Sequence, residues 1–233
     1  LSSLSEADKN KLQHMISGAN SGVGTHISEH IADGELVPLT PAQKILWYAW
    51  KLDPENTTYN MGGALHFEGL LDSSRVNSAF KTLCQKHDAL RIKFVEGELQ
   101  DVWQIDGGDQ TFTFFETTAT DLAQRNAQLK QVVVQPFDLV KGPLLRVGVV
   151  NQGNDSSLVV TLHHIIADGT SMQQLLDEFV AIYVALSEGV ALRETDETVG
   201  YLGFAKWLNN QDQQDLYAKQ LTIWQELLQA DEP

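Results

Sequence analysis

The chain has 233 residues, of which 42% are apolar, and a formal net charge of -15 at pH 7. This length suffices for a buried core as one large domain or as one lobe with an appendage, and no stretch approaches the roughly 20 apolar residues of a membrane span. The charge argues against nucleic acids and anionic membranes as partners, while the one cysteine, Cys84, excludes an internal disulfide and a thiolate metal cluster.

Residues 1–37 differ in composition from the rest of the chain. A short helix is predicted over 5–16, and the segment 17–24, rich in glycine and serine, is typical of a flexible linker. The chain begins at Leu1 without a methionine or a signal-peptide pattern, which favours an excised cytoplasmic fragment. We therefore expect 1–37 to be a linker or upstream interdomain segment and 38–233 to form the compact part.

Helices and strands alternate from there on. Periodic apolar residues and helix-start or helix-end signals predict helices over 41–50, 73–87, 121–134, 170–187, 201–210 and 212–229, with Gly189 ending the fourth. Cys84 falls inside the second helix as a small packing residue. Alternating apolar residues and turn signals predict strands over 90–94, 99–105, 111–116, 144–150 and 157–162. This order predicts an α/β or α+β fold with a mixed or largely antiparallel sheet.

The segment His163-His164-Ile165-Ile166-Ala167-Asp168-Gly169 lies between a predicted strand and a predicted helix. Successive side chains of a strand point to opposite faces, so the adjacent histidines do not share one task. We expect His163 in the interior, as a hydrogen-bonding residue. We expect His164 at the opening of a pocket, where a neutral imidazole held in one tautomer serves as a general base. A purely structural or surface role for His164 is the alternative.

Asp168 admits two roles. It either orients His164 directly or pairs with a buried cation and holds the loop, and its position before Gly169 and a helix start favours the second role. Arg91 is the predicted partner, because a bidentate arginine–carboxylate pair suits a fixed site, and Lys86 is the alternative. The opposite faces of the two histidines disfavour a metal site, and neither a serine nucleophile elbow nor a glycine-rich phosphate loop occurs in the sequence.

Several motifs occur in one order along the chain and together resemble those of a known family. The segment 163–169 matches HHxxxDG, 40–47 (TPAQKILW) resembles SxAQxRLW, 86–94 (KHDALRIKF) resembles RHExLRTxF, and 201–207 (YLGFAKW) resembles YxDFAxW. Over about 38–229 the chain is therefore similar to the N-terminal part of a condensation domain of a nonribosomal peptide synthetase.

The resemblance implies a chloramphenicol-acetyltransferase-like lobe, with a mixed, largely antiparallel sheet flanked by helices. In this family two such lobes enclose a tunnel, and donor and acceptor carrier proteins present thioester-bound substrates on phosphopantetheine arms. His164 would be the catalytic residue that takes the proton of the acceptor amine or positions that amine, with His163, Asp168, Gly169 and Arg91 as the supporting motif. The resemblance implies no cofactor or metal in this lobe. It implies carrier domains, a C-terminal lobe and neighbouring synthetase domains as partners.

The chain departs from the family pattern at two positions and in its extent. Lys86 stands where the family has arginine, which weakens it as a partner of Asp168, and Gly203 stands where the family has aspartate. The motifs of the second lobe do not occur, so we expect one lobe that is inactive by itself. An epimerization or ester-forming domain of the same superfamily, or a lobe that only docks carrier proteins, are the alternatives.

Overall fold

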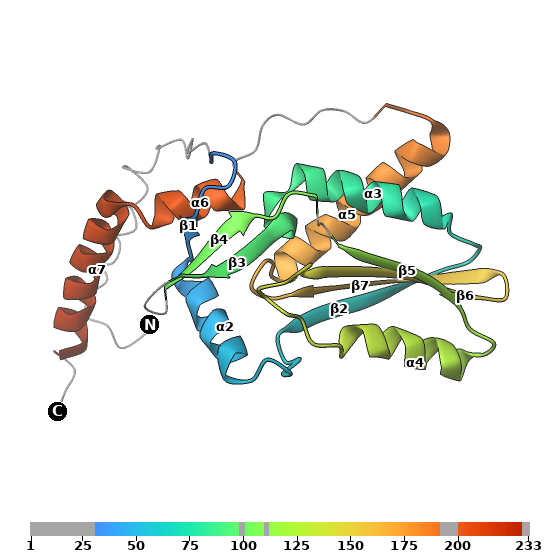
Figure 1. Cartoon of the computed structure of the whole chain (residues 1–233), viewed down its shortest axis with the longest axis horizontal. Coiled ribbons are helices and arrows are strands. Elements are labelled where there is room, and N and C mark those ends of the chain that lie inside the picture. Colours follow the sequence, from blue (N-terminus) through green and yellow to red (C-terminus); the bar gives the residue numbers. More distant parts are fainter. Residues whose placement is uncertain (1–30, 98–100, 110–111, 192–199, 230–233) are drawn as a thin grey trace.

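A four-stranded sheet and a three-stranded sheet organise the chain (Figure 1). The computed structural model describes residues 31–97, 101–109, 112–191 and 200–229. The helix predicted over 5–16 and the adjoining linker segment lie outside these described residues. In the described part of the chain, no helix is long and apolar enough to cross a membrane.

The larger sheet has the strand order β2-β7-β6-β5. Its strands are β2 (Asn60–Phe67), β5 (Thr113–Thr118), β6 (Leu145–Gln152) and β7 (Asp155–His163). Strand β7 pairs antiparallel with both β2 and β6, whereas β5 pairs parallel with β6. Parallel neighbours need a crossover connection, which helix α4 (Leu122–Val133) supplies between them. The sheet is thus mixed and largely antiparallel, which confirms the predicted fold class.

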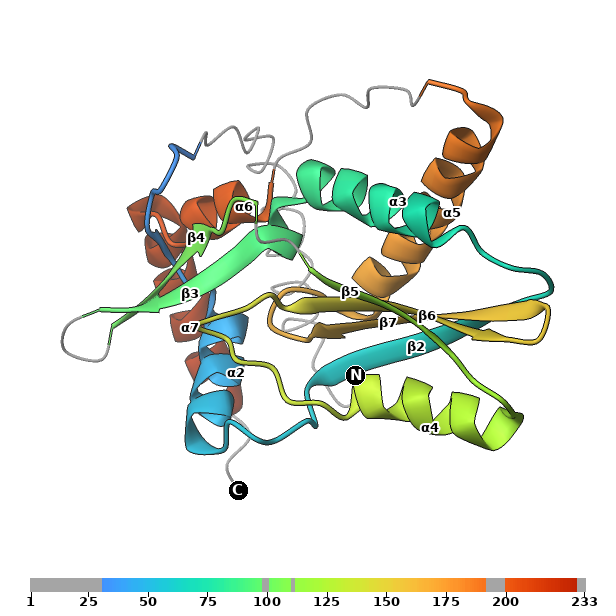
Figure 2. The same cartoon turned by 45° about the vertical axis from the view of Figure 1, so that its right-hand side comes forward.

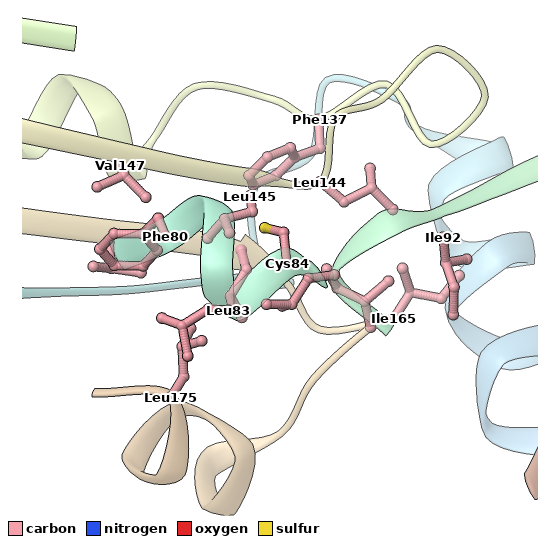
Figure 3. Packing of buried hydrophobic residues seen from close by; sticks show 14 of the residues in the cluster. Phe80, Leu83, Cys84, Ile92, Phe137, Leu144, Leu145, Val147, Ile165 and Leu175 are labelled. Atoms are coloured by element: carbon pink, nitrogen blue, oxygen red, sulfur yellow. The ribbon is translucent and has the colours of Figure 1, made fainter. Parts of the chain in front are cut away.

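Helices cover both faces of this sheet. Helix α4 lies along one face, and α3 (Ser73–Lys86) and α5 (Gly169–Glu188) lie on the other (Figures 1 and 2). The rings of Phe80 on α3 and Phe179 on α5 stack with centroids 4.9 Å apart. Figure 3 shows this core from close by, with Cys84 beside Leu83 and Leu145. Cys84 is fully buried, as expected for a packing residue.

Strand β2 has no counterpart among the predicted strands, although it pairs with β7 along its whole length. Gly62 and Gly63 interrupt its pattern of side chains. A Cβ atom at Gly62 would lie 2.7 Å from Val133 Cγ2, so only glycine lets α4 approach the sheet this closely. Gly62 therefore both obscures the strand pattern of β2 in the sequence and allows α4 to pack closely on it.

The smaller sheet has the order β1-β4-β3 and consists of β1 (Val37–Pro38), β3 (Ile92–Glu96) and β4 (Val102–Asp106). The strand predicted over 90–94 begins later than expected, because a 3₁₀ turn, η1 (Asp88–Arg91), precedes it. Helix α6 (Tyr201–Leu208) packs against β1 and β4.

The other helices of the described residues are α2 (Pro41–Leu52) and α7 (Gln211–Gln229). Helix α2 begins with a capping box, in which the Thr40 hydroxyl accepts from the Gln43 N–H and the Gln43 side chain accepts from the Thr40 N–H. Helix α5 ends at Gly189, whose φ of 68° lies in the left-handed region, as predicted. Within the described ranges, the predicted helices therefore agree closely with the observed ones.

Candidate active site

The end of β7 and the loop that follows it carry the two adjacent histidines. The His164 N–H donates to the Tyr59 carbonyl over 2.9 Å, and the Ile166 N–H donates to the His163 carbonyl over 3.1 Å. Ile165 and Ile166 point into the core and are almost fully buried. The loop is thus fixed at both ends by regular structure and anchored in its middle by apolar side chains.

His163 lies in the interior. Its side chain is 2% exposed, and its Nδ1 accepts a hydrogen bond of 3.1 Å from the Ile165 N–H. The rings of Tyr59 and Phe137 flank it. Burial, with a smaller contribution from His164, lowers the pKa of His163 to about 4, so the ring is neutral at pH 7. The predicted interior position of His163 is confirmed.

His164 points the other way and is exposed to a cavity. Its Nδ1 lies 2.8 Å from the Ala167 carbonyl oxygen. Because a carbonyl oxygen can only accept, Nδ1 carries the hydrogen of the neutral ring and Nε2 is left as the unprotonated nitrogen. The opposite placement of the two histidines agrees with the strand argument, and the loop holds His164 in a single tautomer.

The cavity beside His164 has a volume of about 450 Å³. Walls from α2, from the turn after α3, from the 163–169 loop and from α5 enclose it, and Tyr201 of α6 reaches it. Most of its lining is aliphatic. The polar side chains that contribute to it are Gln43, His87, His164, Asp168, Ser171, Gln174 and Tyr201. Such a mostly apolar pocket with few polar groups is typical of a small-molecule site.

Asp168 caps helix α5. Its Oδ1 accepts from the Ser171 N–H and from the Ser171 hydroxyl, each over 2.8 Å. These hydrogen bonds, the backbone one first, lower the pKa of the Asp168 carboxyl. Asp168 is exposed. It fixes the loop at the point where Gly169 begins the helix, so its architectural contact is a helix cap and not an ion pair.

The predicted pairing of Asp168 with Arg91 is wrong, and so is the alternative with Lys86. Arg91 forms a bidentate pair with Asp106 of β4, with Nε 3.0 Å from Oδ1, and also donates to the carbonyl oxygens at the end of α3. Lys86 Nζ lies 3.0 Å from Glu178 Oε1 on α5. Each cation thus has an acidic partner on an adjacent element, while the N-terminal turn of α5 supplies the donors for Asp168.

Two buried glutamines, of which Gln43 lines the cavity, support the loop. Gln43 Nε2 donates to Gln104 Oε1 over 2.8 Å and to the Ile165 carbonyl over 3.3 Å. Gln104 Nε2 donates back to Gln43 Oε1 over 2.9 Å. Their side chains are 2% and 0% exposed, so these amides depend on one another for hydrogen bonds. Neither glutamine was predicted as a site residue. The sequence offered one signal, because Gln43 is a polar residue among the apolar residues of a predicted helix.

The arrangement provides an unprotonated imidazole nitrogen at the wall of an apolar cavity, on a loop fixed by buried hydrogen bonds. Such a group accepts a proton or a hydrogen bond from a nucleophile. Within the described ranges, no group of three or more His, Cys, Asp or Glu residues is placed to hold a metal ion.

Comparison with curated proteins identifies large peptide synthetases as relatives. The chain is 32% identical over 215 residues to tyrocidine synthase 3 of Brevibacillus parabrevis, a match that covers 91% of this chain and 3% of that protein. It is 32% identical over 222 residues to gramicidin S synthase 2 of Aneurinibacillus migulanus, a match that covers 89% of this chain and 5% of that protein. The chain therefore spans only a small part of the length of these relatives.

Solved structures share the fold. The starter condensation domain of rhizomide synthetase superposes with a TM-score of 0.68 and 23% identity, over 74% of this chain and 44% of that one. An epimerization domain from tyrocidine synthetase B superposes with a TM-score of 0.70 and 20% identity, over 88% of this chain and 48% of that one. The family model for the condensation domain matches residues 34–233. By this match and by its relatives, the chain belongs to the condensation domain family of nonribosomal peptide synthetases.

Proposed function

We propose that residues 38–233 are the N-terminal lobe of a condensation domain that forms an amide bond between a donor acyl thioester and an acceptor amine. The observation that carries this proposal is the position of His164 at the wall of the cavity, with its Nδ1 2.8 Å from the Ala167 carbonyl oxygen. The chain covers 44% of the rhizomide condensation domain and 48% of the epimerization domain, which supports the assignment of one lobe. Residues 1–37 are then a linker or an upstream interdomain segment.

The chemistry requires one proton to move. The acceptor nitrogen attacks the thioester carbon, the C–N bond forms and the C–S bond breaks. His164 Nε2 takes the amine proton, which then passes to the departing thiolate. An α-amine already titrates near neutral pH, so holding the nitrogen in position contributes more than basicity does. In this proposal His163 sets the loop from inside, Asp168 and Gly169 start the helix that follows, and Arg91 fixes the end of α3.

Carrier domains are the proposed partners, and they present both substrates on phosphopantetheine arms. The lobe itself binds no cofactor and no metal in this proposal. A C-terminal lobe and neighbouring synthetase domains complete the active site in the cytoplasm. The acidic character of this chain, with a net charge of -15, favours docking to locally basic patches of those partners.

An epimerization or ester-forming domain of the same superfamily is the second candidate function. The TM-score of 0.70 with an epimerization domain supports epimerization as this second candidate. A lobe that only docks carriers is the non-catalytic candidate. Stereochemical analysis of the carrier-bound product separates the first two, because epimerization changes the configuration at Cα without forming an amide.

The test is single-turnover amide formation by the full synthetase that contains this chain, with loaded donor and acceptor carriers. We expect His164→Ala to reduce the rate by about 10²- to 10⁴-fold, the range for loss of a general base. His66→Ala is the matched control, because His66 lies on β2, is 48% exposed and does not line the cavity. An unchanged rate for His164→Ala would contradict the proposal, and full turnover by residues 1–233 alone would contradict the single-lobe assignment.

A further inference from the structure

A second histidine, His87, reaches the same cavity. It follows the last residue of α3 and lines the cavity wall. Its Nε2 lies 2.7 Å from Glu178 Oε2 on α5. The other oxygen of Glu178 accepts from Lys86 Nζ over 3.0 Å and from Gln174 Nε2 over 3.1 Å. The imidazole is therefore held by a carboxylate that is itself fixed by two further groups.

The carboxylate determines the tautomer of His87. Burial opposes ionisation of Glu178, but hydrogen bonds from His87, Gln174 and Lys86 outweigh it and lower the pKa of Glu178 to about 2. An ionised carboxylate can only accept, so Nε2 of a neutral His87 carries the hydrogen. Nδ1 is then the unprotonated nitrogen, and it makes no hydrogen bond to any of the described residues.

His87 and His164 thus have the same hydrogen-bonding arrangement. Each ring donates one N–H to an oxygen of the protein, the Glu178 carboxylate for His87 and the Ala167 carbonyl for His164. In its neutral form each ring has one nitrogen without a hydrogen, and both rings line one cavity of about 450 Å³. The two imidazoles come from different elements, since His87 follows α3 and His164 follows β7.

The other polar groups of the cavity offer mostly acceptors. Gln43 Nε2 donates to two protein oxygens, Gln174 Nε2 donates to Glu178, and the Tyr201 hydroxyl lies 3.3 Å from the Thr40 hydroxyl. Asp168 adds an ionised carboxylate to the wall. A ligand that complements this wall brings N–H donors, and an amine brings them at the nucleophilic atom itself.

We infer that His87 binds the acceptor amine, by accepting a hydrogen bond from its N–H at Nδ1. This inference rests on the proposed function and adds a second substrate contact to it. His87 neither gains nor loses a proton in this role. It restricts the orientation of the nitrogen whose proton His164 removes, and Glu178 acts as the positioning residue that holds the His87 ring.

Two variants of His87 separate this role from a structural one. The side-chain nitrogen of glutamine reaches the position of histidine Nε2, so His87→Gln keeps a donor to Glu178 but offers no acceptor at the Nδ1 position. The amide of asparagine occupies the position of Nδ1, so His87→Asn keeps an acceptor towards the cavity but loses the contact with Glu178. The assay uses the full synthetase with a loaded donor carrier and leucyl N-acetylcysteamine thioester as the soluble amine.

We expect KM for the amine to rise about tenfold in His87→Gln, the factor that corresponds to one lost hydrogen bond. His87→Asn should fall between this variant and the wild type, and kcat should change less than KM in both. The opposite order, with His87→Asn more impaired than His87→Gln, would overturn the inference, because it is the order expected if His87 only fastens α3 to α5. An unchanged KM in His87→Gln would overturn it as well.

Two controls identify which assignment is at fault. The des-amino analogue of the leucyl thioester, in which hydrogen replaces the α-amino group, keeps the amide of the arm but has no donor at that carbon. If His87→Gln weakens inhibition by this analogue as much as it weakens use of the amine, then the amide of the arm is the ligand of His87 and the inference is wrong. His164→Ala is assayed in parallel. Retained amide formation in His164→Ala would contradict the proposed function, whereas its loss together with a normal His87→Gln would contradict only the role of His87.

Discussion

Replacing Gln43 by methionine tests whether the paired glutamines hold the His164 loop. Methionine has nearly the same length and volume, so the variant removes the amide without leaving a large cavity. The lost hydrogen bonds are those with the Thr40 N–H, with both amide atoms of Gln104, and with the Ile165 carbonyl. The substitution therefore measures the contribution of these buried hydrogen bonds separately from that of the surrounding packing.

The expected magnitude follows from these contacts. A net contribution of about 1 kcal/mol for each of the four hydrogen bonds gives about 4 kcal/mol. The apolar body of methionine regains about 1 kcal/mol by burial. We therefore expect Gln43→Met to lower the free energy of unfolding by about 3 kcal/mol. Gln104→Met should be costly for the same reason, because each single variant takes two hydrogen bonds away from the other buried amide. In Gln43→Met, for example, Gln104 Oε1 loses its donor and Gln104 Nε2 keeps only the Pro38 carbonyl.

Urea unfolding followed by tryptophan fluorescence measures both singles and the double variant Gln43→Met/Gln104→Met. The double variant should cost less than the sum of the singles by about 1 kcal/mol or more, since it leaves no orphaned partner amide. The slope of the transition should stay constant, which shows that compactness is unchanged. A loss below about 1 kcal/mol in Gln43→Met, or strict additivity, would refute the view that this network fixes the loop.

Three further predictions concern the frame around the site. A Cβ at Gly148 would lie 1.9 Å from the Phe115 ring, so Gly148→Ala should cost about 1–3 kcal/mol in urea unfolding, and adding Phe115→Leu should recover part of this loss; an unrelieved loss would argue against the clash. Asp88→Ala removes the carboxylate that accepts from the first two N–H groups of α6 and should cost about 1–2 kcal/mol, with Asp88→Asn milder; equal losses would contradict capping. The lowered pKa of Glu178 contributes stability above its ordinary value of 4.5 that is lost as pH falls towards about 2, and Glu178→Gln should flatten this acid limb of the stability profile.

Local patterns in the sequence predicted the helices, most strands and the opposite placement of the two histidines. Helix periodicity and strand alternation depend on near neighbours along the chain, so a buried Cys84 and an interior His163 follow without tertiary information. Strand β2 was not predicted because its stability comes from pairing with β7 and from the close approach of α4 over Gly62. The sequence of residues 60–67 alone indicates neither the pairing with β7 nor the packing of α4.

The partner of Asp168 could not be derived for a related reason. The sequence contains more carboxylates than lysines and arginines together, and only the distances in the folded chain determine which of them form ion pairs. Arg91 lies beside Asp106 through the pairing of β3 with β4, and Lys86 faces Glu178 because α3 packs on α5. The cavity and its second imidazole also arise from this packing of distant elements, so residue types alone did not reveal them.

The contacts that close the cavity join segments far apart in the chain. Thr40 meets Tyr201 across 161 positions, and Gln43 meets Ile165 across 122 positions. Long-range contacts of this kind form late in folding, because the chain must first give up the entropy of large loops. During synthesis, a nascent chain that has not yet released α6 holds His164 beside an incomplete cavity. The cavity beside His164 is therefore complete only after α6 has been synthesised and has packed against β1 and β4.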